Sequence, residues 1–83
     1  MKYKLSNSSR ILINGEQLIL GNRNTGDWIK TSKQVYDILM LGIDKNLSIE
    51  DLLTHLYDDE DRKYIKTIYD NLCYLKIIDN GKT

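Results

Sequence analysis

The residues of this chain that could carry chemistry are few and widely separated. The only histidine, His55, and the only cysteine, Cys73, lie eighteen positions apart. A zinc site needs several such ligands in a compact set, and a cysteine nucleophile needs a base beside it. The favoured interpretations are a surface or boundary place for His55 and semi-buried packing for Cys73. The chain also has no phosphate-binding glycine loop. We therefore expect no catalytic residues, no cofactor and no metal site.

An acidic run, "DDED" at Asp58 to Asp61, is the one place where carboxylates gather. Carboxylates bind hard cations, but they are also stabilised at the positive end of a helix dipole. The run precedes a segment with helical periodicity, so helix capping is preferred over a metal site. The protein is not expected to be an enzyme, and its function is sought on its surfaces.

Length and composition indicate the class of protein. Residues 1–83, with 41% apolar and 29% charged side chains, predict one globular domain with an ordered core over about residues 4–79. Twelve basic and twelve acidic residues cancel, which removes the general attraction to phosphate that most nucleic-acid binders show. No apolar run approaches the roughly 18 residues of a membrane span, and the N-terminus lacks the apolar part of a secretory signal. With one cysteine, the reducing cytoplasm is the expected location.

The first half of the chain is predicted to form a small antiparallel sheet. Asn14-Gly15 lies between two aliphatic runs, which is typical of a type I′ hairpin because both residues tolerate a positive φ. This turn places strands at about 9–13 and 16–21, after a loose lead-in over residues 1–8.

A third strand is expected in "DWIKT", Asp27 to Thr31, after a polar turn. Side chains alternate between the two faces of a strand. Ile29 and Thr31 would therefore share one face, with Trp28 and Lys30 on the other.

Helical periodicity follows in three segments. Thr31 or Ser32 can cap a first helix that ends near Gly42, and Ser48 with Asp51 resembles the capping box of a second. The acidic run starts a third helix that ends near Lys76, and "KIID" follows as a short return. The apolar stripes of the helices are Val35, Ile38, Leu39 and Leu41; Ile49, Leu52, Leu53 and Leu56; and Ile65, Ile68, Leu72 and Leu75. The sequence thus predicts an α+β, winged-helix-like fold, in which a three-stranded antiparallel sheet precedes three helices (β-β-β-α-α-α).

A winged-helix shape makes DNA binding one candidate function. A recognition helix usually presents basic or polar groups near its N-terminus, whereas the third helix here begins with carboxylates that would repel phosphate. The hairpin also precedes the helices, while a DNA-contacting wing would follow them. A winged-helix regulator of transcription is kept as the alternative, and no nucleic acid is expected as a partner.

Peptide binding suits the chain better. The far side of the third strand has no partner in the sequence, and its unpaired N–H and C=O groups can accept an extended segment. The third helix could form a second wall. One flank of this helix carries Arg62, Lys66, Tyr69 and Cys73, and the opposite flank carries Tyr64 and Asn71. The first flank suits a peptide with apolar anchors and acidic residues. An ordinary boundary between core and solvent explains any one of these residues equally well.

A family resemblance points the same way. "WIKTSKQVYDIL", from Trp28 to Leu39, resembles the strand-and-helix pattern of PqqD-like RiPP recognition elements. "LGIDKNLSIEDLLTHLYD" is similar to the segment that follows it in the family, and "IYDNLCYLKIID" to the closing turn. Ser32 stands at the capping place. Thr31 replaces a more usual aliphatic residue, and Lys76 replaces a small one. The resemblance covers about residues 4–79.

The resemblance implies a non-catalytic module that binds the leader region of a ribosomally synthesised precursor peptide. In the family the leader adds as a strand beside the third strand, in the groove that this strand forms with the third helix. Carried onto this chain, the peptide-binding residues are Asp27, Trp28, Ile29, Lys30 and Thr31 on the strand and Arg62, Lys66, Tyr69 and Cys73 on the helix. For Trp28, a place in the peptide site and simple shielding of the outer sheet face stay open.

The resemblance also implies a second partner, a maturation enzyme such as a radical SAM protein or a cyclase/peptidase. The module occurs in the family either as a separate protein or fused to the enzyme. The initial Met fits a free-standing form, and an excised N-terminal domain fits equally well. Self-association into a homodimer through the same strand edge is also left open.

Overall fold

The computed structural model describes residues 3–79. Its elements in chain order are β1 (Lys4–Leu5), β2 (Ser9–Asn14), β3 (Gln17–Asn22), β4 (Trp28–Ser32), α1 (Lys33–Asp44), α2 (Ile49–Leu53), α3 (Asp59–Tyr74) and β5 (Ile78–Asp79). The predicted α+β fold, with a three-stranded antiparallel sheet followed by three helices, is confirmed. A small two-stranded sheet, β1 with β5, is an addition to it.

The hairpin of β2 and β3 forms as predicted, but its turn lies one residue later than expected. Asn14 pairs with Gln17, so Gly15 and Glu16 are the two turn residues. Gly15 has a φ of 64°, and Glu16 has no positive φ. A positive φ at the first turn position alone is the pattern of a type II′ turn, which replaces the predicted type I′ turn.

The three helices begin at the predicted capping residues. The Ser32 side chain accepts a hydrogen bond from the Val35 N–H at 3.2 Å, and Ser48 accepts one from the Asp51 N–H at 3.1 Å. The Asp58 carboxylate accepts one from the Glu60 N–H at 2.9 Å. Each of these bonds satisfies a backbone donor that the first helical turn leaves unpaired.

The lead-in is more ordered than the sequence predicted. Lys4 and Leu5 pair with Asp79 and Ile78, so the expected short return of the chain is the strand β5. The Tyr3 side chain is only 1% exposed and belongs to the core. The expectation of a loose segment over residues 1–8 is therefore wrong for its described part.

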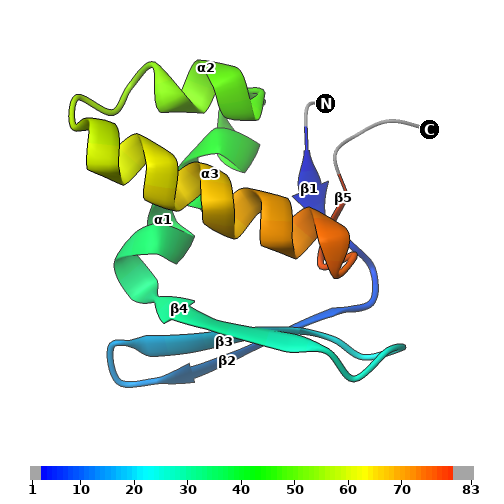
Figure 1. The fold of residues 1–83 in the computed structure, drawn as a ribbon. Coiled ribbons are helices and arrows are strands. Elements are labelled where there is room, and N and C mark those ends of the chain that lie inside the picture. Colours follow the sequence, from blue (N-terminus) through cyan, green and yellow to red (C-terminus); the bar gives the residue numbers. More distant parts are fainter. Residues whose placement is uncertain (1–2, 80–83) are drawn as a thin grey trace.

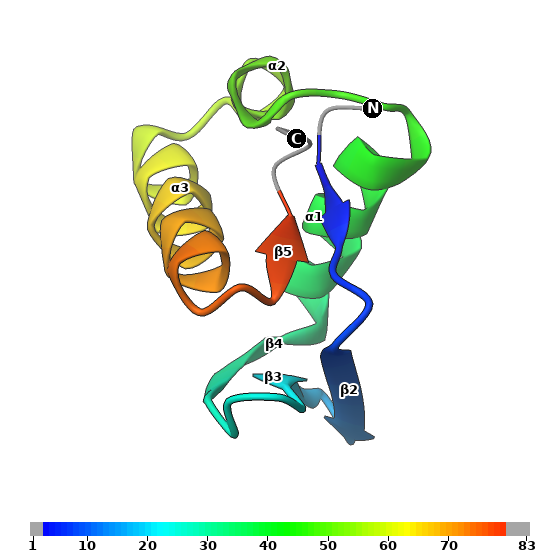
Figure 2. The same cartoon turned by 90° about the vertical axis from the view of Figure 1, so that its right-hand side faces the viewer.

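The helices lie on one face of the three-stranded sheet, and no element of residues 3–79 covers the other face (Figure 1). Seen from the side, α3 and α1 flank the small β1–β5 sheet, and α2 crosses above them (Figure 2). The core between the sheet and the helices contains Tyr3, Leu18, Leu20, Val35, Leu39, Ile49, Leu52, Ile65, Ile68, Tyr69, Leu72, Ile77 and Ile78. Leu41, expected in the apolar stripe of the first helix, is 41% exposed.

Candidate functional site

The outer edge of β4 is the first component of the candidate site. In the three-stranded sheet the order is β2-β3-β4, and the side of β4 away from β3 has no partner strand among residues 3–79. The segment is shifted by one residue from the prediction, because β4 begins at Trp28. Asp27 lies in the preceding turn, where its N–H donates to the Thr25 hydroxyl at 3.2 Å.

The backbone groups of β4 alternate between β3 and the open side. Two bonds at the ends of the strand fix this alternation: the Asn22 N–H donates to the Asp27 carbonyl at 2.9 Å, and the Lys33 N–H donates to the Glu16 carbonyl at 3.1 Å. In an antiparallel pair every second residue bonds to its neighbour. With the observed register, the N–H and C=O groups of Ile29 and Thr31 point to β3. Those of Trp28 and Lys30 point to the open edge, whereas the Ser32 carbonyl belongs to the N-cap of α1.

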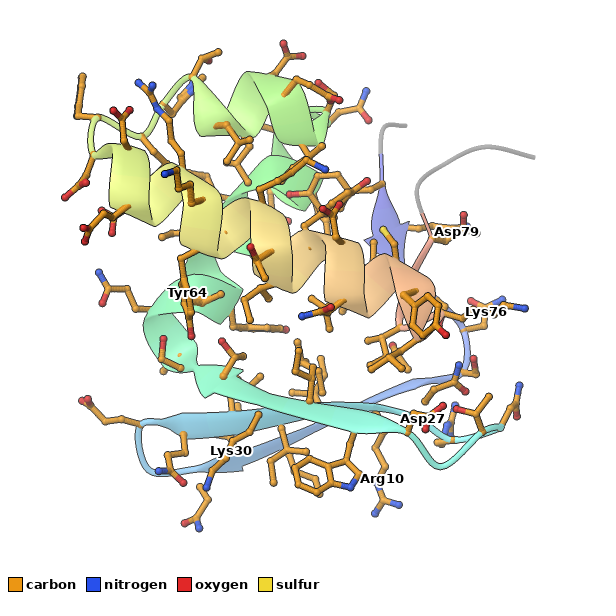
Figure 3. All side chains as sticks on the ribbon, viewed as in Figure 1. Arg10, Asp27, Lys30, Tyr64, Lys76 and Asp79 are labelled. Carbon is orange, nitrogen blue, oxygen red and sulfur yellow. The ribbon has the colours of Figure 1, made fainter. Side chains whose placement is uncertain are left out.

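The side chains of β4 divide between the two faces as predicted. Thr31 is buried, and Ile29 is half-buried against the core. Trp28 is 63% exposed, and Lys30 is exposed on the same outer face. Figure 3 shows the Lys30 side chain extending away from the helices. Trp28 therefore lies on the outer face of the sheet and not between the sheet and the helices.

Helix α3 runs along the same side of the molecule as β4 (Figures 1 and 2). One of its flanks packs against other elements. Tyr69 is 8% exposed, and its ring meets that of Tyr3. The Arg62 Nε donates to the Leu56 carbonyl, just before α3, at 2.7 Å. The flank that carries Arg62 and Tyr69 is thus directed to the N-terminal segment and to the α2–α3 connection. The structure does not bring these two predicted residues to the edge of β4.

The cations on this flank are already paired within their own helix. Lys66 Nζ lies 2.6 Å from an Asp70 carboxylate oxygen and 5.7 Å from the centre of the Tyr69 ring. Arg62 Nη1 lies 3.3 Å from an Asp59 carboxylate oxygen. Exposed pairs of this spacing contribute only a few tenths of a kcal/mol to stability. They nevertheless place a competing carboxylate beside each cation, which weakens the case for these cations as peptide ligands.

Cys73, the last predicted residue of the wall, is half-buried at the C-terminal end of α3. It lies in a hollow with residues of the β3–β4 turn, Asn24 and Thr25, and with Asp79 of β5. Burial raises the pKa of the Cys73 thiol, so the group stays protonated near neutral pH. A thiol in this state is a packing group and not an activated nucleophile, which agrees with the semi-buried interpretation of the sequence.

The opposite flank of α3 is the one directed to the sheet. Figure 3 shows the Tyr64 side chain extending from α3 toward the end of the molecule where β4 enters α1. Tyr64 is half exposed, and Asn71, seven residues later, lies on the same flank. The sequence places these two residues on the flank opposite the predicted wall. The apolar stripe of α3 is buried as predicted, but a helical pattern does not indicate which of the two flanks beside it faces the sheet.

The described residues offer little other chemistry. Residues 3–79 contain no group of three or more His, Cys, Asp or Glu side chains that could hold a metal ion. The Nδ1 of His55 lies 3.1 Å from the Asp51 carbonyl on the exposed side of α2. In the same part of the chain, no helix is long and apolar enough to cross a membrane.

No protein-family model, curated protein or solved structure matches this chain. The candidate site is therefore described from its own geometry.

Proposed function

We propose that this domain binds the leader region of a ribosomally synthesised precursor peptide and presents it to a maturation enzyme. The peptide is added as a strand to the open edge of β4. The domain itself contributes binding and no catalysis. The partner enzyme, fused or separate, carries out the modification in the cytoplasm and is of the radical SAM or cyclase/peptidase kind that the family resemblance implies.

The observation that carries this proposal is the direction of the backbone groups of β4. Two residues, Trp28 and Lys30, direct both N–H and C=O groups to the open side, as the register and the flanking bonds require. Each hydrogen bond to an added strand contributes about 0.5–1.5 kcal/mol net. Several such bonds with a few side-chain contacts correspond to an affinity of about micromolar or tighter.

We place the second wall of the proposed groove on a different flank of α3 from the one expected from the sequence. Tyr64 and Asn71 replace the predicted flank of α3, because that flank faces the N-terminal segment and the α2–α3 connection. An aromatic ring beside a strand edge suits apolar leader side chains on the inner face.

A pair of variants at Lys30 tests the proposal. The Lys30 N–H points to the open edge, so Lys30→Pro removes a donor for the peptide and leaves the bonds to β3 in place. Lys30→Ala removes the same side chain but keeps the donor. The probe is a synthetic leader of a precursor encoded beside this gene, titrated by calorimetry. We expect Lys30→Ala to bind with a modest loss and Lys30→Pro to lose binding by about tenfold or more.

Equal binding by the two variants would contradict strand addition. Ile29→Pro serves as a folding control, since the Ile29 N–H points to β3 and the loss of this donor should destabilise the sheet itself.

A duplex DNA titration tests the alternative function. DNA binding that falls steeply with salt, without leader binding, would favour a winged-helix regulator.

A further inference from the structure

The outer face of the three-stranded sheet carries a surface that leader binding at the β4 edge does not use. The register places Arg10, Gly21 and Trp28 in one row across the three strands, and Leu12, Ile19 and Lys30 in the next. Alternation puts all six on the face away from the helices. Figure 3 shows the Arg10 and Lys30 side chains extending from this face. We call these six residues the outer patch.

The outer patch contains a hollow. Gly21 lies between Arg10 and Trp28 and has no side chain to fill the row. A Cβ at this position would lie 3.3 Å from the Asp27 carbonyl oxygen and 3.5 Å from the Trp28 Cβ. The hollow over Gly21 has a volume of about 560 Å³ and is bordered by Leu12, Ile19 and Trp28. It has room for an apolar side chain of a partner, with the Trp28 indole as one wall.

The patch is also basic, although the chain as a whole has no net charge. It contains or borders three cationic side chains, those of Arg10, Arg23 and Lys30, and only one carboxylate, that of Asp27. Arg23 donates to the Asn7 carbonyl at 3.0 Å. Within residues 3–79, neither Arg10 nor Lys30 has an ion-pair partner, in contrast to Arg62 and Lys66 on α3.

We propose that the outer patch binds an acidic segment of a partner protein, with an apolar side chain seated over Gly21 and carboxylates on Arg10 and Lys30. Two features together select this partner. The exposed indole and aliphatic side chains favour an apolar anchor, and the unpaired cations favour carboxylates around it. This inference goes beyond leader binding, because it concerns a face of the sheet and not its edge. A leader at the edge and a partner on the face can be bound together.

The only tryptophan of the chain supplies a direct signal for this surface. Trp28 is 63% exposed, so acrylamide should quench its fluorescence efficiently in the free protein. The probe is the synthetic peptide Glu-Asp-Leu-Leu-Glu-Asp, with Gln-Asn-Leu-Leu-Gln-Asn as the uncharged control. We expect the acidic peptide to protect Trp28 from acrylamide and the control peptide to do so weakly. The protection should fall as salt rises between about 50 and 300 mM.

Variants on β2 separate this surface from the β4 edge. Arg10 and Leu12 lie on β2, at the opposite side of the sheet from the β4 edge. Arg10→Gln and Leu12→Ser should each weaken the affinity for the acidic peptide by about tenfold. Lys63→Gln, an equal charge change on the exposed side of α3, should have no effect. Lys30→Pro and Lys30→Ala should weaken binding of the acidic peptide to the same extent, because both remove the Lys30 cation and only Lys30→Pro blocks the edge. Circular dichroism confirms that each variant is folded.

Three results would overturn the proposal. In the first, millimolar acidic peptide leaves the quenching of Trp28 by acrylamide unchanged. In the second, the acidic peptide binds Arg10→Gln and the unmodified protein with equal affinity. In the third, duplex DNA protects Trp28 from acrylamide and the acidic peptide does not, and this protection is lost in Arg10→Gln. That result would make the patch a phosphate-binding surface. None of these results depends on leader binding, so failure here is distinguishable from failure of the β4 edge.

Discussion

The ring of Tyr69 on α3 meets the ring of Tyr3 edge to face, with 5.3 Å between their centres and 76° between their planes. Tyr3 is in turn held by α1, because its hydroxyl donates to the Leu39 carbonyl at 2.8 Å. This chain of contacts ties the N-terminus, α1 and α3 together. The flank of α3 that carries Tyr69 therefore contacts the N-terminal segment, and the opposite flank is the one directed to the sheet.

Tyr3→Ala should destabilise the fold by about 3–5 kcal/mol, since it removes a fully buried aromatic side chain and leaves a cavity. Tyr3→Phe keeps the ring and loses only the hydroxyl, which predicts a cost of about 1 kcal/mol. Urea denaturation measures both values. Tyr57→Ala is the matched control, because Tyr57 is 96% exposed and should change stability by less than about 0.5 kcal/mol. Similar losses at positions 3 and 57 would contradict the anchoring role.

Asn22 should prove to be a second anchor, between β3 and the end of α3. Its buried side-chain amide donates to the Leu75 carbonyl at 3.1 Å and the Lys76 carbonyl at 3.3 Å, and its oxygen accepts from the Asn24 N–H at 2.8 Å. Asn22→Asp keeps the acceptor and loses both donors. We expect a loss of about 1–3 kcal/mol in the free energy of unfolding, measured in urea. Asn24→Asp, in the exposed turn, should lose much less free energy of unfolding. Equal losses in the two variants would contradict the anchoring role of Asn22.

Thr31→Val should stabilise the protein. The Thr31 hydroxyl is buried and has no hydrogen-bond partner among the described residues. Valine has nearly the same shape and removes the unsatisfied group, which predicts a gain of about 1 kcal/mol. Thermal unfolding should show a higher midpoint, and leader binding should be unchanged because the Thr31 backbone bonds to β3. A lower midpoint would show that the hydroxyl is satisfied in solution.

Stability should fall in alkaline solution through the buried tyrosines. Burial raises the pKa of Tyr3 from 10.0 to about 12, and burial likewise raises the pKa of Tyr69. Below pH 10 both states keep the Tyr3 proton. Above pH 10 the unfolded chain releases it first, so the free energy of unfolding decreases as pH rises toward 12. Urea midpoints between pH 9 and 11 should fall less steeply for Tyr3→Phe than for the unmodified protein. Parallel profiles would contradict this source of the pH dependence.

The sequence predicted those parts of the fold that depend on local signals. Ser32, Ser48 and Asp58 cap helices because each satisfies backbone donors two or three residues away. The alternation in β4 placed Ile29 and Trp28 on their observed faces for the same reason, since the period of a strand is local.

Which flank of α3 faces the sheet could not be predicted in this way. It depends on Tyr3, whose partner Tyr69 is far away in the chain, and on the pairing of two-residue strands that have no periodicity to detect. A helical wheel separates the flank of Tyr69 from that of Tyr64, but it does not say which flank meets the sheet. The predicted helix wall was therefore placed on the flank that contacts the N-terminal segment.

The central claim is that a peptide adds as a strand to β4, and amide hydrogen exchange measures it most directly. In the free domain, the N–H groups of Trp28 and Lys30 point to the open edge and should exchange quickly, while those of Ile29 and Thr31, directed to β3, should be protected. With saturating leader peptide, the Trp28 and Lys30 amides should become protected by about tenfold or more. Binding of the leader with no change at these two amides would contradict the account.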